Sequence, residues 1–173
     1  MKHKTKFLTW AVVYLLSAAA VCFSADFRLD RIVDGDTLEV VTGNGERITV
    51  DLVGIDAPEM PKRNAKKGQP FCKQARQMLA DLIVNKRFSF QAHSALINHY
   101  VLAVVYSEGK DVNLEMIKAG FAEVQKGALP SGFDVAPYRK EEAAAKKKEK
   151  GMWALGRVYI SPTEWRKASQ KFP

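Results

Sequence analysis

Residues 31–59 read RIVDGDTLEVVTGNGERITVDLVGIDAPE, and this stretch decides the fold. Apolar and polar residues alternate through Thr37–Val41 and again through Arg47–Ile55, which is typical of half-buried β-strands. Thr42–Gly45 between them is a hairpin signal, because Asn and Gly adopt the positive φ that tight β-turns need. Asp34-Gly35 indicates a further turn after a first strand over residues 27–33. The stretch therefore predicts three meandering strands.

The spacing of apolar residues changes to a helical period after Phe71. An amphipathic helix is predicted there by Ala75, Met78, Leu79, Leu82 and Ile83. Strands are predicted at 88–91 and 101–106, followed by a short helix at 111–118, a strand at 121–124 and a polar helix at 138–150. These strands and about three helices, without a repeat or a linker, indicate an α+β domain built on a small, five-stranded β-barrel. The five-stranded OB-fold barrel with packed helices fits this order best.

The composition fits one globular domain. The chain has 173 residues, of which 47% are hydrophobic and 27% charged, so long disorder and collagen-like repeats are excluded. A formal net charge of +8 favours an acidic partner over a basic one.

Residues 1–24 predict a secretory signal peptide. Lysines at positions 2, 4 and 6 precede an apolar run from Phe7 to Val21, and small residues follow it. The run is shorter than the ~20 residues that cross a bilayer as a helix. We therefore expect cleavage after Ser24, export to the periplasm or the medium, and no membrane association afterwards. The mature domain, residues 25–173, is expected to be a monomer, and its lone Cys72 cannot form an intramolecular disulfide.

Two segments, Val33–Thr37 and Leu52–Glu59, resemble the staphylococcal nuclease (thermonuclease) family in their order and separation. The resemblance extends over nearly the whole mature chain, through Gly68–Phe71, residues 102–113 and Gly151–Trp153. It implies an OB-fold phosphodiesterase that binds one Ca²⁺ and hydrolyses DNA and RNA.

The resemblance also implies a role for each acid in these segments. Asp36 and Asp56 are the expected Ca²⁺ carboxylates, and the backbone carbonyl of Ala57 is a third oxygen ligand, of the type that this hard cation prefers. Glu59 is the expected catalytic residue, which positions or deprotonates the attacking water. Asp34 is explained more simply by its Asp-Gly turn.

The cationic part of the family's site is missing. Active members carry one arginine at the position of Asp51 and another at the position of Tyr100. The arginine fork stabilises charge that builds on a phosphate, and losing one such donor costs on the order of 10²- to 10³-fold in rate. Asp51 would instead add a carboxylate to the metal ligands. We therefore expect Asp51 and Tyr100 to be degenerate positions.

Other side chains could replace the arginines. Arg47 points to the same face of its strand as Asp51, although it is displaced by roughly 13 Å along the strand. His93 and His99 flank the site region and could bind a transition metal or donate a proton, but two histidines without a third ligand are more often ordinary loop residues.

The basic residues allow two interpretations. Lys62, Arg63, Lys66 and Lys67 lie in a predicted loop and are the expected nucleic-acid-binding residues, through salt-sensitive contacts with DNA or RNA phosphates. The basic residues between positions 139 and 150 could extend this surface, or they could form only the solvated face of a helix.

Two functions remain open from the sequence. One is a metal-binding module with little or no nuclease activity, which binds nucleic acid or an unknown protein partner. The other is an active Ca²⁺-dependent phosphodiesterase with a rearranged cationic clamp. The missing arginine pair favours the first.

Overall fold

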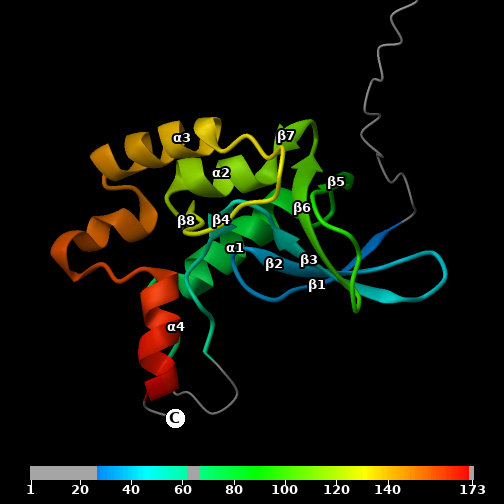
Figure 1. Ribbon diagram of the computed structural model, residues 1–173, viewed down its shortest axis with the longest axis horizontal. Helices are drawn as coiled ribbons and strands as arrows, with labels where there is room; N and C mark the ends of the chain where they lie inside the picture. The colour runs from blue at the N-terminus through cyan, green and yellow to red at the C-terminus, as the bar shows by residue number, and fades with distance from the viewer. Residues whose placement is uncertain (1–26, 62–66, 172–173) are drawn as a thin grey trace, which may run out of the picture.

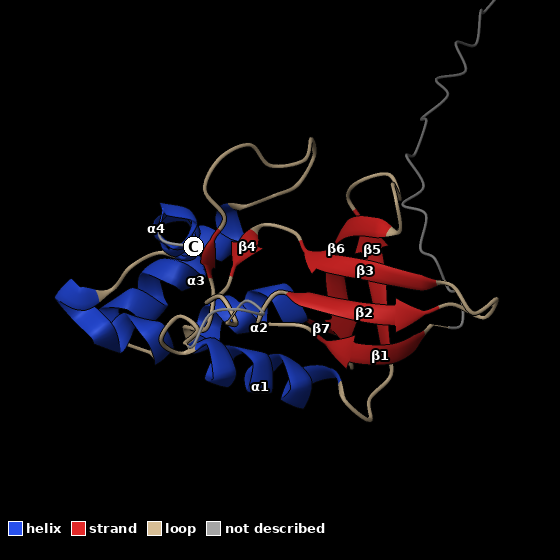
Figure 2. Ribbon diagram, turned by 90° about the horizontal axis from the view of Figure 1, so that it is seen from below, coloured by secondary structure: helices blue, strands red, loops and turns tan. Residues whose placement is uncertain are grey.

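The computed structural model describes residues 27–61 and 67–171, in which a mixed β-sheet lies at one end and the helices gather at the other (Figure 1, Figure 2). The sheet has six strands in the order β1-β2-β3-β6-β5, with β7 paired to β6. Their bounds are Arg28–Ile32 for β1, Thr37–Val41 for β2, Arg47–Leu52 for β3, Phe88–Ala92 for β5, Tyr100–Ser107 for β6 and Lys110–Asp111 for β7. Two short strands, β4 (Ile55–Asp56) and β8 (Glu123–Val124), pair separately.

The predicted meander is confirmed. Strands β1, β2 and β3 pair antiparallel, and the hairpin at Thr42–Gly45 joins β2 to β3 so that Thr37 lies opposite Asp51. Strand β6 then pairs parallel to β3, with Asp51 opposite Leu102. The sheet contains the five strands predicted before residue 107 and also β7, because the chain turns back after Ser107, whereas the strand predicted at 121–124 is β8 of the separate pair.

The predicted helices are present, with one addition. Helix α1 covers Cys72–Ile83, and α2 (Val112–Ala119) begins where the Asp111 side chain accepts a hydrogen bond from the Leu114 amide and ends at the left-handed Gly120. Helix α3 spans Ala136–Lys147, and a 3-10 segment, η1, spans Gly151–Val158. The expectation of about three helices is wrong, since a fourth α-helix, α4 (Pro162–Lys171), follows.

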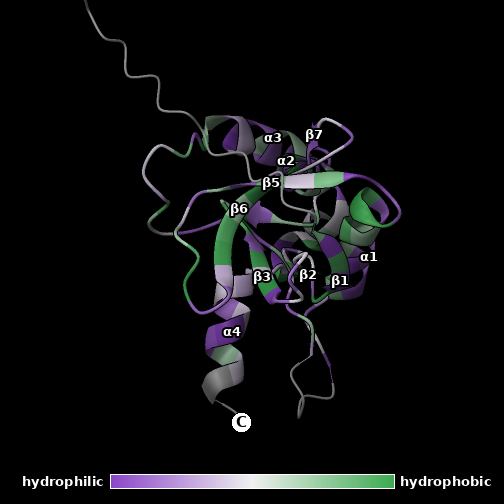
Figure 3. Cartoon of the chain, turned by 90° about the vertical axis from the view of Figure 1, so that its right-hand side faces the viewer, coloured by the Kyte–Doolittle hydropathy of each residue, from purple (hydrophilic) through white to green (hydrophobic). Residues whose placement is uncertain are grey.

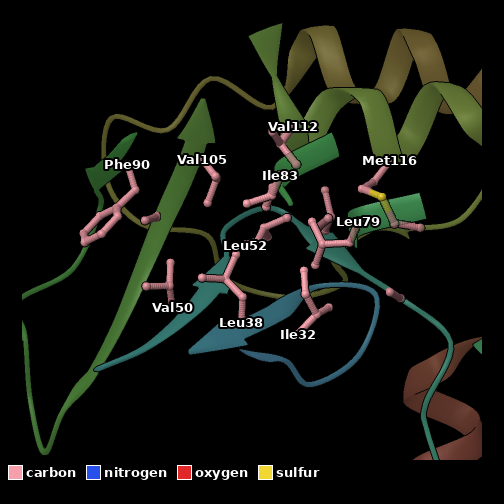
Figure 4. Close-up of a cluster of buried hydrophobic side chains, with 14 of the residues drawn as sticks. Ile32, Leu38, Val50, Leu52, Leu79, Ile83, Phe90, Val105, Val112 and Met116 are labelled. Carbon is pink, nitrogen blue, oxygen red and sulfur yellow. The ribbon is translucent and has the colours of Figure 1, made fainter. Parts of the chain in front are cut away.

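The core lies between the sheet and the helices, as Figure 4 shows. Leu38, Val50 and Leu52 extend from the sheet toward Leu79 of α1 and Met116 of α2. The buried Asn113 adds polar contacts, since its amide donates to the carbonyls of Val53 and Ala103 and accepts from the Val105 amide. These contacts fix the end of β3, where the site begins.

Helix α4 extends away from the sheet and carries hydrophilic residues, whereas β6 is largely hydrophobic (Figure 1, Figure 3). Within the described residues, no helix combines the length and apolar character that a bilayer crossing requires. The predicted signal peptide and Lys62, Arg63 and Lys66 lie outside the described residues.

Candidate active site

A pocket of about 290 Å³ gathers acidic side chains from the ends of several strands. We call it the acidic pocket, and its carboxylates are Asp34, Asp36, Asp51, Asp56 and Glu59. The structure thus brings together four predicted site residues, Asp36, Asp51, Asp56 and Glu59. Lys126, Thr163 and Arg166 line it as well.

Asp36 is held by the turn between β1 and β2. Asp34 accepts a hydrogen bond from the Asp36 amide (3.2 Å), so it serves the turn as well as lining the pocket. A Cβ on Gly35 would lie 2.7 Å from the Cβ atoms of both Ala57 and Ala75. Glycine is therefore required for the turn to pack this closely against these two alanines. The Ala57 amide donates to Asp36 Oδ2 at 2.6 Å. Burial, followed by the charge of Asp34, raises the pKa of Asp36 well above its usual range.

Asp56 enters the pocket from β4. Gly54 makes the turn from β3 with a φ of +81°, and a Cβ there would lie 2.4 Å from the ring of Phe133. After this turn, Asp56 lines the acidic pocket and pairs with Glu123 of β8 across the two short strands. Asp56 is only 4% exposed, so its charge requires a close partner.

That partner is Arg166 of α4, which sequence reasoning missed. Its guanidinium donates to Asp56 Oδ1 and Oδ2, both at 2.8 Å, and also contacts Glu59 Oε1. Thr163, one helical turn earlier, donates to Asp56 Oδ2 at 3.0 Å. The hydrogen bonds to Asp56 raise the pKa of Arg166, so the guanidinium stays charged.

Asp51 and Tyr100, the positions expected to be degenerate, contact each other, and Asp51 also lines the pocket. The hydroxyl of Tyr100, on β6, donates to Asp51 Oδ2, on β3. Burial raises the pKa of Asp51, and burial together with the hydrogen bond to Asp51 raises that of Tyr100, so the hydroxyl keeps its proton at neutral pH.

The other candidates lie elsewhere or have different partners. Arg47 contacts Asp30 (2.8 Å) and Glu39 (3.4 Å) at the far end of β3, so it does not replace the arginine missing at position 51. His93 packs edge-on against Phe133. Among the described residues, no three acidic, histidine or cysteine side chains converge closely enough to hold a metal ion.

The sequence does contain a local signal for the start of α4. Ser161-Pro162-Thr163-Glu164 has the form of a capping box with proline at the first helical position. The Ser161 amide and hydroxyl donate to Glu164 Oε2, and the Glu164 amide donates back to Ser161 Oγ at 3.3 Å. The signal predicts the helix, but it does not predict that Arg166 reaches Asp56.

The family profile described as staphylococcal nuclease homologue matches residues 49–155, so the match ends before α4. An uncharacterized endonuclease of Haemophilus influenzae is 33% identical over 81% of this chain and 72% of its own length. Probable endonucleases LCL3 of Verticillium alfalfae and Coccidioides posadasii are 33% and 38% identical over 73% and 66% of this chain. The chain spans 46% and 41% of these two fungal relatives.

Proposed function

Because the chain belongs to the staphylococcal nuclease family, we propose that it is a nuclease homologue that binds a divalent cation in the acidic pocket and hydrolyses phosphodiesters only weakly. The observation that carries the proposal is the hydrogen bond between Asp51 and Tyr100. At the two positions where the family places arginines, this chain has a carboxylate and a neutral hydroxyl that satisfy each other. Neither offers a phosphate the charged, planar fork of a guanidinium.

No three acidic, histidine or cysteine side chains converge in the arrangement that the described residues adopt. The chemistry of the pocket's donors nevertheless fits Ca²⁺ or Mn²⁺, because its side chains offer carboxylate oxygens, the ligands that these cations take. Asp36 and Asp56 would hold the cation. The backbone carbonyl of Ala57 and the carboxylate of Asp51 would supply further oxygen ligands. A bound divalent cation would polarise the phosphate. Glu59 would accept a proton from the attacking water, once the guanidinium of Arg166 no longer contacts its carboxylate.

Thermal unfolding tests the cation site. Several acidic groups held together repel one another, so a cation that binds only the folded state should raise the Tm by mass action. We expect millimolar Ca²⁺ or Mn²⁺ to raise the Tm of the wild type and not that of an Asp36→Ala, Asp56→Ala variant. An equal rise in both proteins, or none in either, would remove the cation site from the proposal.

The second candidate is an active Ca²⁺-dependent phosphodiesterase with a rearranged clamp. It is favoured by one observation, namely that Arg166 and Lys126 bring positive charge to the same pocket. In the arrangement described, however, Arg166 is engaged by Asp56 and Glu59, and Lys126 lies 3.4 Å from Glu123. If Arg166 is the clamp, Arg166→Gln should abolish Ca²⁺-dependent hydrolysis; under the first proposal there is little hydrolysis to lose.

We further propose that the mature chain is an exported monomer whose basic residues bind DNA or RNA phosphates without sequence preference. Such binding should weaken steeply with salt. Family membership also supports closure of the sheet into an OB-fold barrel, and Phe27, next to β1, lies 4.6 Å from Phe90 of β5, ring to ring.

A further inference from the structure

Helix α4 is attached to the body of the protein largely through the acidic pocket. Four residues of its outer face, Glu164, Lys167, Ala168 and Ser169, are exposed. Its inward side chains are Thr163 and Arg166, which both contact Asp56, and Trp165, which lines a small apolar cavity with Pro70 and Tyr159. The attachment of α4 therefore depends in part on the state of one carboxylate and in part on the apolar contacts of Trp165.

That carboxylate has both of its oxygens engaged. Arg166 takes Oδ1 and Oδ2 in the bidentate geometry that is the strongest for this pair, and Thr163 shares Oδ2. A divalent cation bound to carboxylate oxygens lies at about 2.3–2.6 Å from them. The guanidinium occupies the approach to these oxygens, so a cation that bound Asp56 would have to displace it.

We propose that Arg166 is a tethered cation that competes with the divalent cation for Asp56, so that cation binding releases the guanidinium and loosens α4 from the pocket. This inference rests on the proposed function, because it assumes that the cation binds at Asp36 and Asp56. We call α4 the strap, because Arg166 holds this helix to the acidic pocket without the cation and releases it when the cation binds. It also assigns a role to a segment that lies beyond the residues matched by the family profile.

Titration calorimetry with Ca²⁺ and with Mn²⁺ measures the competition. Arg166→Gln removes the competitor, so the variant should bind the cation about tenfold more tightly than the wild type, which corresponds to one charge-assisted hydrogen bond no longer displaced. Lys167→Gln is the matched control, because it removes one positive charge from the exposed face of the same helix. Its cation affinity should stay close to that of the wild type.

Hydrogen exchange of the α4 amides provides a readout that requires no variant. In the wild type, saturating cation should accelerate exchange in residues 162–171. In Arg166→Gln, exchange there should already be fast, and the cation should add little.

The outcomes separate this inference from the function on which it rests. Tighter binding by Arg166→Gln together with cation-accelerated exchange of α4 in the wild type supports the strap. Equal or weaker binding by Arg166→Gln, or α4 exchange that the cation slows or leaves unchanged, overturns the strap and leaves the cation site standing. No binding by either protein overturns both.

Discussion

The two sides of the acidic pocket satisfy their carboxylates in different ways. On the side of β3 and β6, Asp51 is paired with the neutral hydroxyl of Tyr100. On the side of β4, Asp56 and Glu59 share the guanidinium of Arg166. Compared with the arginine positions that the family resemblance implies, the pocket has an acid and a hydroxyl there and a guanidinium at another place. Under the proposed function, a guanidinium bound to the metal carboxylates is not equivalent to one that faces the phosphate.

The largest effect is expected from restoring arginines on the β3–β6 side. Asp51→Arg with Tyr100→Arg replaces the paired acid and hydroxyl by two guanidinium groups, and should raise Ca²⁺-dependent nuclease activity by about 10²-fold or more. Asp51→Arg alone should give less, because the two donors act on the same developing charge. Initial rates on a fluorescent oligonucleotide measure the gain.

Adding Glu59→Gln to the Asp51→Arg, Tyr100→Arg variant tests whether the gained nuclease activity depends on the acidic pocket. Because Glu59 is the proposed base, the amide should remove most of the added activity. Activity that persists in this triple variant would show that another group handles the water.

The β4 side can be weakened by removing its guanidinium. Without cation, Arg166→Gln should lower the free energy of unfolding by about 1–2 kcal/mol. Among the described residues it leaves the buried Asp56 with Thr163 as its remaining side-chain partner, while the partial exposure of Arg166 limits the loss. Urea unfolding measures the change. If Lys167→Gln lowered the free energy of unfolding as much as Arg166→Gln, the contact between Arg166 and Asp56 would contribute nothing beyond the positive charge that each lysine or arginine adds to the helix.

A smaller effect is expected from the β3–β6 pair. Tyr100→Phe removes one hydrogen bond at a partly exposed site, where Tyr100 is 40% exposed, and should lower the free energy of unfolding by about 0.5–1 kcal/mol. The control is Tyr106→Phe on the same strand. If Tyr100→Phe proved as costly as Arg166→Gln, the difference between the two sides of the pocket would disappear.

The carboxylates could be predicted from sequence because their positions are local. Asp36 follows an Asp-Gly turn that packs on Ala57, and Asp56 follows the Gly54 turn that ends the meander. In each case, the residues next to the acid set the turn that directs it into the pocket. The hairpin at Thr42–Gly45 then fixes the register that places Asp51 in the same pocket.

The partners of these carboxylates could not be predicted, because they depend on long-range packing. Arg166 is 110 positions from Asp56, and no periodicity connects them. Likewise, the sequence singles out Asp51 and Tyr100 as departures from the arginines that the family resemblance implies, but their contact with each other follows from the parallel pairing of β3 with β6. A local signal can predict an element, whereas the element's contacts are set by the whole fold.

The most direct test of the account is the nuclease activity of the unmodified protein. Hydrolysis of a fluorescent DNA or RNA oligonucleotide should be measured with Ca²⁺ and with EDTA, beside Asp36→Ala. The account predicts a Ca²⁺-dependent rate about 10²-fold or more below that of the Asp51→Arg, Tyr100→Arg variant. Rapid hydrolysis by the wild type that both EDTA and Asp36→Ala abolish would contradict it, and would show that Arg166 or Lys126 stabilises the phosphate in place of the missing arginines.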